Sequence, residues 1–307
     1  MASVHSAPEV SIVLPVFNEA GHLGEEISRI RSAMDRSEFS YEIIVVDDGS
    51  TDGSGDELAA IPGIRLVRFG TNRGSGSARK YGTMLARGEV VVWTDVDMTY
   101  PNDTIPELVE QLHGFDQVVG ARTSEEGTLR FLRTPAKWLI RRLASYLSGV
   151  KIPDLNSGFR AFRREVGLQF VHLLPKGFSC VTTLTMTFLT NGYSVRYVPI
   201  EYAARRGESK FHWLSDTRRY VLQVVRMTLM YEPLRVFGPP AVVIGLVATG
   251  KLIFDLVDKD FRIGTNTLVL LGLAATLLLV GMLADLLVQL NRRRHEVVPA
   301  TSFEVES

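Results

Sequence analysis

Short apolar runs recur along the first two thirds of the chain, and each run ends in a cluster of polar residues. Four runs are rich in β-branched residues, which is typical of buried strands: residues 10–15, 41–46, 64–69 and 90–93. Between the runs, apolar residues recur at helical spacing, as at Ile27, Ile30 and Met34. Strands that alternate with helices in this way predict parallel βαβ units and therefore an α/β domain.

The polar clusters that follow these four runs are expected to lie at one edge of the predicted sheet. Carboxyl ends of parallel strands meet at a common edge, and ligands of such sheets bind there. The clusters are residues 15–19, 47–52, 72–79 and 95–97. The first run is not followed by G-x-G-x-x-G, and no Walker A sequence occurs. The sequence therefore predicts a ligand-binding site at this edge of the sheet. It disfavours a dinucleotide-binding Rossmann protein and a P-loop enzyme.

Two carboxylates, Asp95 and Asp97, follow the run at 90–93 and are separated by one residue. Strand alternation would point both side chains the same way. Two like charges placed together are costly unless a positive group lies between them. A hard divalent cation whose other ligands are phosphate oxygens would supply that charge. An acidic turn without a metal is the simpler alternative. The motif alone does not distinguish a metal site from such a turn.

Cationic segments dominate the middle of the chain. Residues 118–122 predict a further strand that ends in Arg122, and basic and aromatic residues alternate beyond it. This pattern predicts an amphipathic helix at about residues 130–147 that lies in a membrane interface; an ordinary solvated helix is the alternative. Residues 205–210 place three cations around a glycine, which suits a phosphate but also occurs in basic surface turns.

Two long apolar runs near the C-terminus predict membrane spans at about residues 234–257 and 266–290. About 22 helical residues cross the ~30 Å hydrocarbon core. Arginines flank the hairpin on one side, so the positive-inside rule places domain 1–230 and tail 293–307 in the cytoplasm. Asp285, within the second run, should have a partner or lie near the cytosolic surface.

Composition narrows the function classes. The chain has 34 basic and 34 acidic residues, so no global charge favours nucleic acid as a partner. The single cysteine, Cys180, excludes an internal disulfide and fits a reducing compartment. Residues 1–9 lack the basic start and apolar run of a signal peptide.

With these residues in view, the chain resembles the family 2 glycosyltransferases, and among them the polyprenyl-phosphate, dolichyl-phosphate mannose synthase-like branch. The matching stretches follow the family order and read IVLPVFNE (12–19), VVDDGSTD (45–52), TDVD (94–97), NSGFR (156–160) and RGESK (206–210). The resemblance implies a GT-A fold, which is a Rossmann-like, mostly parallel sheet flanked by helices. Two C-terminal transmembrane helices complete the implied architecture.

The resemblance also implies roles on the nucleotide side. Pro15, Phe17 and Glu19 would line the nucleotide pocket, Asp48 would read the base, and Arg79 would approach the nucleotide.

Further roles follow for the metal and the phosphates. Asp95 and Asp97 would hold Mg²⁺ or Mn²⁺ on the donor diphosphate, and Asp154 would position or activate the acceptor. Four residues would bind the phosphates of donor or acceptor: Arg122, Arg206, Ser209 and Lys210. Some family members carry a metal-binding Gln where this chain has Thr99, which leaves the metal ligand set open.

The implied function is that of a membrane-bound inverting glycosyltransferase. It would move a sugar from a UDP- or GDP-linked donor to a polyprenyl phosphate, for cell-envelope glycan or protein glycosylation. The expected location is the inner membrane, and the resemblance allows a homo-oligomer. A processive polysaccharide synthase is an alternative, although Gln223 and Arg226 lack the tryptophan of its membrane-proximal motif. A non-catalytic membrane scaffold is another alternative, which the intact pair Asp95 and Asp97 disfavours.

Overall fold

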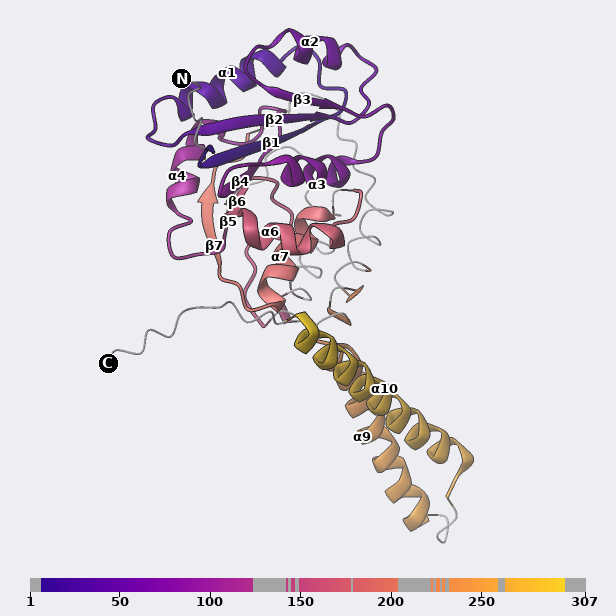
Figure 1. Ribbon diagram of the computed structural model, residues 1–307. Helices are drawn as coiled ribbons and strands as arrows, with labels where there is room; N and C mark the ends of the chain where they lie inside the picture. Colours follow the sequence, from indigo (N-terminus) through magenta and orange to yellow (C-terminus); the bar gives the residue numbers. More distant parts are fainter. Residues whose placement is uncertain are drawn as a thin grey trace, which may run out of the picture. The chain divides into compact units, whose positions relative to one another are not determined.

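The computed structural model describes residues 7–123, 142, 145–146, 149–177, 179–203, 222, 225–226, 228–229, 232–258 and 263–295 (Figure 1). The chain forms two compact units, Met1–Val224 and Val225–Ser307. Several predicted features lie outside the described residues: Arg206, Ser209, Lys210, most of the helix expected at 130–147, and the tail beyond 295.

A seven-stranded sheet forms the centre of the first unit, in the order β3-β2-β1-β4-β6-β5-β7. The strands are β1 Val10–Val16, β2 Tyr41–Asp47, β3 Arg65–Arg68, β4 Val90–Trp93, β5 Gln117–Arg122, β6 Arg160–Arg163 and β7 Val195–Ile200. Only β6 runs antiparallel to its neighbours, β4 and β5. The other pairings are parallel. The prediction of a mostly parallel α/β sheet is confirmed.

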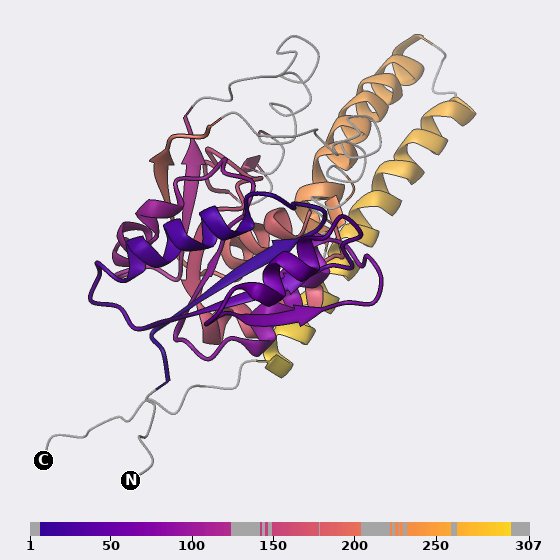
Figure 2. The same ribbon diagram turned by 90° about the horizontal axis from the view of Figure 1, so that it is seen from above.

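Helices cover both faces of this sheet (Figures 1 and 2). Apolar residues of β1 and β2 pack on one face against α1 (Leu23–Met34), α2 (Ser54–Ala60) and α4 (Ile105–Glu110). On the other face, alternate residues of β1, β2 and β4 pack against α3 (Ser75–Leu85), α6 (Arg164–Phe170) and α7 (Cys180–Thr190). The described part of this unit also contains the 3₁₀ helices η1 (Asn102–Thr104) and η2 (Val171–Leu173). Because both faces are buried, the strands read as continuous apolar runs.

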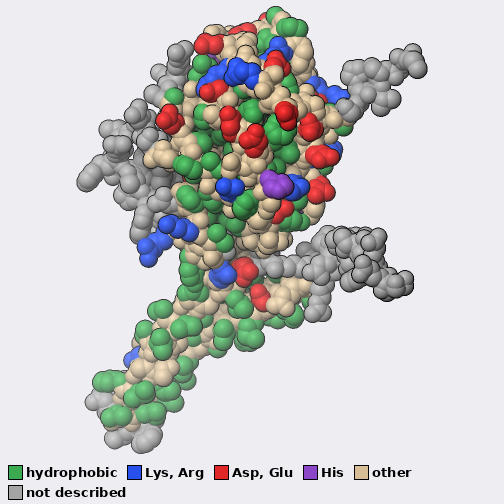
Figure 3. All heavy atoms as spheres, turned by 90° about the vertical axis from the view of Figure 1, so that its left-hand side faces the viewer, with side chains coloured by type: hydrophobic (Ala, Val, Ile, Leu, Met, Phe, Trp, Pro, Cys, Tyr) green, Lys and Arg blue, Asp and Glu red, His purple; other side chains and the backbone are tan. Residues whose placement is uncertain are grey.

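The second unit is a helical hairpin of α9 (Leu234–Asp258) and α10 (Thr265–His295), which lie side by side (Figures 1 and 2). Segments Leu234–Val257 and Thr265–Leu290 are each long and apolar enough to cross a membrane. Apolar side chains cover the visible hairpin surface (Figure 3). A hairpin with so apolar a surface indicates a membrane protein.

Two details of the hairpin differ from, or add to, the sequence prediction. Helix α10 continues to His295, past the predicted end at 290 and through Arg292 to Arg294. Asp285 has the partner that was expected: its Oδ2 accepts a hydrogen bond from Gln289 Nε2 at 2.7 Å.

Candidate functional site

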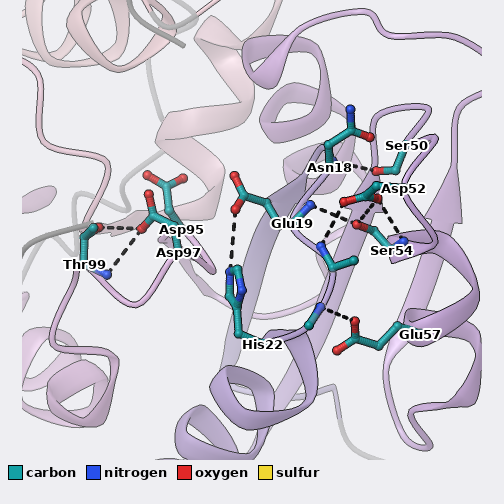
Figure 4. Close-up of polar contacts among 12 residues, drawn as sticks. Asn18, Glu19, His22, Ser50, Asp52, Ser54, Glu57, Asp95, Asp97 and Thr99 are labelled. Atoms are coloured by element: carbon teal, nitrogen blue, oxygen red, sulfur yellow. Dashed lines mark hydrogen bonds and ion pairs between the residues drawn. The ribbon is translucent and has the colours of Figure 1, made fainter. Parts of the chain in front are cut away.

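The loops that follow β1 and β2 are joined to each other by side-chain hydrogen bonds (Figure 4). The Asn18 amide donates to Ser50 Oγ at 3.1 Å, and the Glu19 amide donates to Ser54 Oγ at 2.9 Å. Asn18 has a positive φ of 53°, which an asparagine tolerates better than most residues. Phe17 and Glu19 therefore lie in a fixed loop, and half-buried Pro15 lies just before it, near the end of β1.

Asp48 joins the β2 loop to the glycine-rich segment. Its carboxylate is 2 % exposed, and its two oxygens accept the backbone amides of Arg73 and Gly74, each at 2.7 Å. Burial raises the pKa of Asp48 above its ordinary value, although these two hydrogen bonds oppose the rise. Asp48 thus fixes the turn that leads into α3.

The glycines of this segment allow a close backbone approach. A Cβ at Gly74 would lie 2.3 Å from the Lys176 carbonyl oxygen, and a Cβ at Gly76 would lie 2.1 Å from that of Pro175. The amides of Gly76 and Ser77 donate to the Lys176 carbonyl. The first turn of α3 is therefore capped by the 175–177 backbone.

Arg79, on α3, lies behind the two carboxylates. Its side chain is buried, and Nη2 donates to Asp95 Oδ1 at 2.5 Å. Burial would lower the pKa of Arg79, but the Asp95 carboxylate together with Cys180 and Tyr100 raises it above its ordinary value. Arg79 is therefore a fixed positive charge that orients Asp95.

Asp95 and Asp97 lie side by side after the end of β4 (Figure 4). Strand β4 ends at Trp93, as the apolar run at 90–93 predicts, so both carboxylates lie in the loop beyond the strand. Directly after Asp97 the chain turns, and Met98 has a positive φ of 61°. The Asp95 side chain is one third exposed, whereas Asp97 is 7 % exposed. Thr99 Oγ1 donates to Asp97 Oδ1 at 2.5 Å.

Gly158, in the segment before β6, forms a wall of the Asp95 site. A Cβ at Gly158 would lie 2.9 Å from Asp95 Oδ2 and 3.0 Å from Arg79 Nη2. The Gly158 amide donates to the Tyr100 hydroxyl at 2.7 Å. The NSGFR segment therefore packs directly on the carboxylate loop, and glycine is needed there because no side chain fits.

Arg122 and Asp154 form a bidentate ion pair. Arg122 Nε donates to Asp154 Oδ2 at 2.7 Å, and Nη2 donates to Oδ1 at 3.0 Å. Burial alone would raise the pKa of Asp154, but the Arg122 guanidinium and two backbone amides hold it below its ordinary value. A carboxylate with a lowered pKa is a poor proton acceptor, so this geometry suits positioning rather than proton abstraction.

Three residues that received no role from the sequence also shape the site: Tyr100, Asn102 and Gly158. Asn102 Nδ2 donates to the Asp95 carbonyl oxygen at 3.0 Å and to Glu26 on α1. Gly158 could have been singled out, since a glycine before an aromatic strand often marks a close approach. Tyr100 and Asn102 carry no such signal, because their contacts are distant in sequence.

A divalent cation is compatible with the donor set. The two carboxylates Asp95 and Asp97 offer the hard oxygen ligands that Mg²⁺ and Mn²⁺ prefer. Within the described residues, no three His, Cys, Asp or Glu side chains lie close enough together to bind a metal ion by themselves. An ion held by Asp95 and Asp97 would have coordination positions left for water or for a bound molecule.

The chain is similar in sequence to one protein family and to several known enzymes. Residues 11–167, just over half of the chain, match the family described as Glycosyl transferase family 2. The chain is 34% identical over 212 residues to an undecaprenyl-phosphate 4-deoxy-4-formamido-L-arabinose transferase of Aeromonas hydrophila, covering 66% of this chain and 62% of that protein, less than two thirds of its length. The enzyme of the same name from Enterobacter sp. (strain 638) is 31% identical over 261 residues, 82% of this chain and 78% of that protein.

A more distant relative and a set of solved structures extend the comparison. Dodecaprenyl-phosphate galacturonate synthase of Rhizobium johnstonii is 27% identical over 90% of this chain and 85% of its own length. Glucosyl-3-phosphoglycerate synthase of Mycobacterium tuberculosis, crystallised with Mn²⁺ and UDP-glucose, is 26% identical with a TM-score of 0.55, covering 72% of this chain and 78% of its own. A crystal of that enzyme with phosphoglyceric acid as well gives a TM-score of 0.58 at 23% identity, over 72% and 80%.

Proposed function

Because this chain belongs to glycosyl transferase family 2, we propose that it is a membrane-bound inverting glycosyltransferase. It moves a sugar from a UDP- or GDP-linked donor to a polyprenyl phosphate and makes a polyprenyl phospho-sugar. The observation that carries the proposal is the pair Asp95 and Asp97 at the carboxyl edge of the sheet, held by Arg79 and Gly158, in a chain with an apolar hairpin.

The relatives support each substrate of this proposal. Two of them are named as undecaprenyl-phosphate transferases and a third as a dodecaprenyl-phosphate synthase, which supports a polyprenyl-phosphate acceptor. The Mycobacterium tuberculosis enzyme was crystallised with Mn²⁺ and UDP-glucose, which supports a nucleotide-sugar donor and a divalent cation. The apolar hairpin would keep the enzyme at the membrane that holds the lipid.

Asp97 and Asp95 would hold Mg²⁺ or Mn²⁺ against the donor diphosphate. The bound ion would offset the negative charge that develops on the departing nucleoside diphosphate. Arg79 fixes the rotation of Asp95 from behind, and Thr99 fixes that of Asp97. Because each carboxylate is already held by a partner, little side-chain freedom would be lost when the donor binds, which lowers the cost of binding.

The nucleoside would occupy the loops after β1 and β2. Pro15, Phe17 and Glu19 line the pocket, and Glu19 points from its loop toward the side of Asp95 and Asp97 (Figure 4). Asp48 reads the base: each of its oxygens accepts one backbone amide and has a second lone pair for a base N–H.

The acceptor phosphate would meet a cationic surface. Arg122 is held in one orientation by Asp154, which makes Arg122 a ready phosphate ligand and Asp154 its positioning residue. Arg206, Ser209 and Lys210 complete this acceptor site in our proposal, on the strength of the RGESK motif.

The reaction is a single displacement at the anomeric carbon. An oxygen of the polyprenyl phosphate attacks that carbon, and the bond from the carbon to the oxygen of the nucleoside diphosphate breaks. The acceptor oxygen is already anionic at neutral pH, so no general base has to remove a proton. Inversion gives a β-linked polyprenyl phospho-sugar, with the nucleoside diphosphate as the second product.

We propose a cytoplasmic location for both termini and for the catalytic domain of residues 1–230, with the tail at 293–307. The cationic residues Arg292, Arg293 and Arg294 close the second span on the side where basic residues precede the first. A helix at about residues 130–147 would lie in the membrane interface. A homo-oligomer is compatible with this arrangement.

Transfer assays with labelled UDP- and GDP-sugars, polyprenyl phosphate and Mn²⁺ or Mg²⁺ test the proposal. Label should appear in organic-extractable lipid with at least one donor, and Asp97→Asn should reduce turnover at least 100-fold while the protein stays folded. Label in polymer would indicate a processive synthase instead. Failure of every donor with metal present would indicate a non-catalytic scaffold.

A further inference from the structure

Thr99 acts on Asp97 through two groups. Its side chain is 1 % exposed, and its hydroxyl donates to Asp97 Oδ1 at 2.5 Å. Its backbone amide approaches the same oxygen at 3.3 Å. Both contacts hold one oxygen of the carboxylate, so Thr99 sets the rotation of the Asp97 side chain.

Thr99 also binds the segment that leaves β7. The Ala203 amide donates to the Thr99 carbonyl oxygen at 3.0 Å, and the Tyr202 phenol interacts electrostatically with the Thr99 side chain. Thr99 therefore connects the Asp97 carboxylate to the segment that carries Tyr202.

Tyr202 in turn contacts Arg122. The guanidinium carbon of Arg122 lies 5.2 Å from the centroid of the Tyr202 ring, within the range of a cation–π contact. The Tyr100 ring meets the same ring edge to face, with centroids 5.1 Å apart. Arg122 is thus fixed by Tyr202 on its face and by Asp154 along its edge.

We propose that Thr99 is a positioning residue that couples Asp97 to Arg122 through Tyr202, and that it is not a metal ligand. The roles of Asp97 and Arg122 in this inference rest on the proposed function. Residues that orient a ligating carboxylate typically change metal affinity 10–100-fold when they are replaced. The same link would keep the metal-bound donor and the acceptor phosphate in a fixed relation, which a displacement reaction requires.

Mn²⁺ binding to the purified full chain, followed by the EPR signal of free Mn²⁺ with UDP and in parallel with GDP, tests the first half of the link. Thr99→Val keeps the shape of the side chain and removes its hydroxyl, so Mn²⁺ affinity should fall about 10-fold. Thr99→Ser keeps the hydroxyl and should stay within about twofold of the wild type. Thermal unfolding of each variant serves as the folding control.

Tyr202 variants test the second half. Tyr202→Phe keeps the ring beside Arg122 but removes the hydroxyl, and it should weaken Mn²⁺ binding about threefold. Because its hydroxyl acts through Thr99, the double variant with Thr99→Val should bind Mn²⁺ no more weakly than Thr99→Val alone. Tyr202→Leu removes the contact with Arg122 and should raise the KM for polyprenyl phosphate about 10-fold with a smaller change in kcat.

The outcomes separate this inference from the proposed function. Wild-type affinity in Thr99→Val, or fully additive effects in the double variant, would overturn the coupling alone. If the wild type binds no Mn²⁺ with either nucleotide, the metal site of the proposed function fails as well. Equal losses in Thr99→Ser and Thr99→Val would assign the effect to packing and overturn the role of the hydroxyl.

Discussion

Both units of the chain contain an aspartate that is held by specific partners, but the two carboxylates are held in different ways. In the hairpin, Asp255 is fully buried, and its Oδ2 accepts hydrogen bonds from the Gly264 amide at 2.9 Å and the Thr267 hydroxyl at 2.5 Å. Those partners lie within 12 residues of it. In the α/β unit, one third of the Asp95 side chain is exposed, and it is held by Arg79, which comes from another element of the fold.

The difference teaches what each carboxylate can do. Asp255 caps the start of α10 from α9 and closes the turn of its own hairpin, which is a structural task. Asp95 is oriented by Arg79 and walled by Gly158, while part of it stays accessible to a ligand. A carboxylate fixed from behind on rigid elements and open in front is the arrangement that suits a binding site.

Among the variants that test this comparison, Gly158→Ala should cause the largest loss of activity. The new methyl group would lie 2.9 Å from Asp95 Oδ2 and 3.0 Å from Arg79 Nη2, so one of the pair must move. A displacement of about 1 Å at a reacting centre costs about 100-fold, and we expect that loss in kcat/KM for sugar transfer.

Gly24→Ala is the matched control for this prediction. A Cβ at Gly24 meets no atom within 4 Å, and the residue lies inside α1. Transfer by this variant should stay within about twofold, with a stability gain of about 0.5–1 kcal/mol. Full activity of the Gly158→Ala variant would contradict the claim that a side chain at position 158 disturbs Asp95 and Arg79.

Arg160→Met should separate stability from activity. Arg160 is fully buried and donates to the Val181 carbonyl at 2.9 Å, the Thr185 hydroxyl at 2.9 Å and the Ser157 carbonyl. Within the described part of the chain no carboxylate pairs with it, and burial lowers its pKa to about 10. A buried charge without a counter-charge stabilises little, so the melting temperature should change by only a few degrees.

Activity should respond differently, because Arg160 holds Ser157 next to the Gly158 wall. We expect kcat/KM to fall about 10-fold in Arg160→Met. A melting temperature that collapses together with activity would instead make Arg160 a residue of the fold. Arg163→Met, at the exposed end of the same strand, is the control and should change neither quantity.

Much of the α/β unit could be predicted from the sequence. The apolar runs gave the positions of β1 to β4, and the parallel order brought their polar ends together. Strand ends were close to prediction: β4 stops at Trp93, where its apolar run ends, and β1 continues one residue beyond Pro15 to Val16. The antiparallel direction of β6 could not be read locally, since it depends on pairing with β4 and β5 across long stretches of chain.

The contacts within the site were less accessible to prediction. The ion pair of Arg79 with Asp95 requires α3 to dock closely on β1, which happens where Gly82 meets Val13. No local pattern around Arg79 encodes that approach. The pairing of Asp154 with Arg122 likewise joins segments 32 residues apart.

Asp255→Ala tests the structural side of the comparison. It leaves the Gly264 amide and the Thr267 hydroxyl without their buried acceptor, and an unsatisfied buried donor costs about 1–3 kcal/mol. Equilibrium unfolding in detergent micelles should show a loss of that size. Transfer activity measured at a temperature where the variant is folded should remain within about twofold of the wild type, because the site lies in the other unit.

Asp285→Ala should have the smallest effect and is the control for Asp255→Ala, since both replace an aspartate of the same hairpin. The Asp285 side chain is half-buried and accepts a hydrogen bond from Gln289 one helical turn away. Pairs at this spacing stabilise a helix by only about 0.2–0.5 kcal/mol, so unfolding in detergent should change by no more than that. A loss as large as that of Asp255→Ala would show that Asp285 has a further partner within the membrane. The contrast between the fully buried Asp255 and the half-buried Asp285 would then no longer explain the stability of the hairpin.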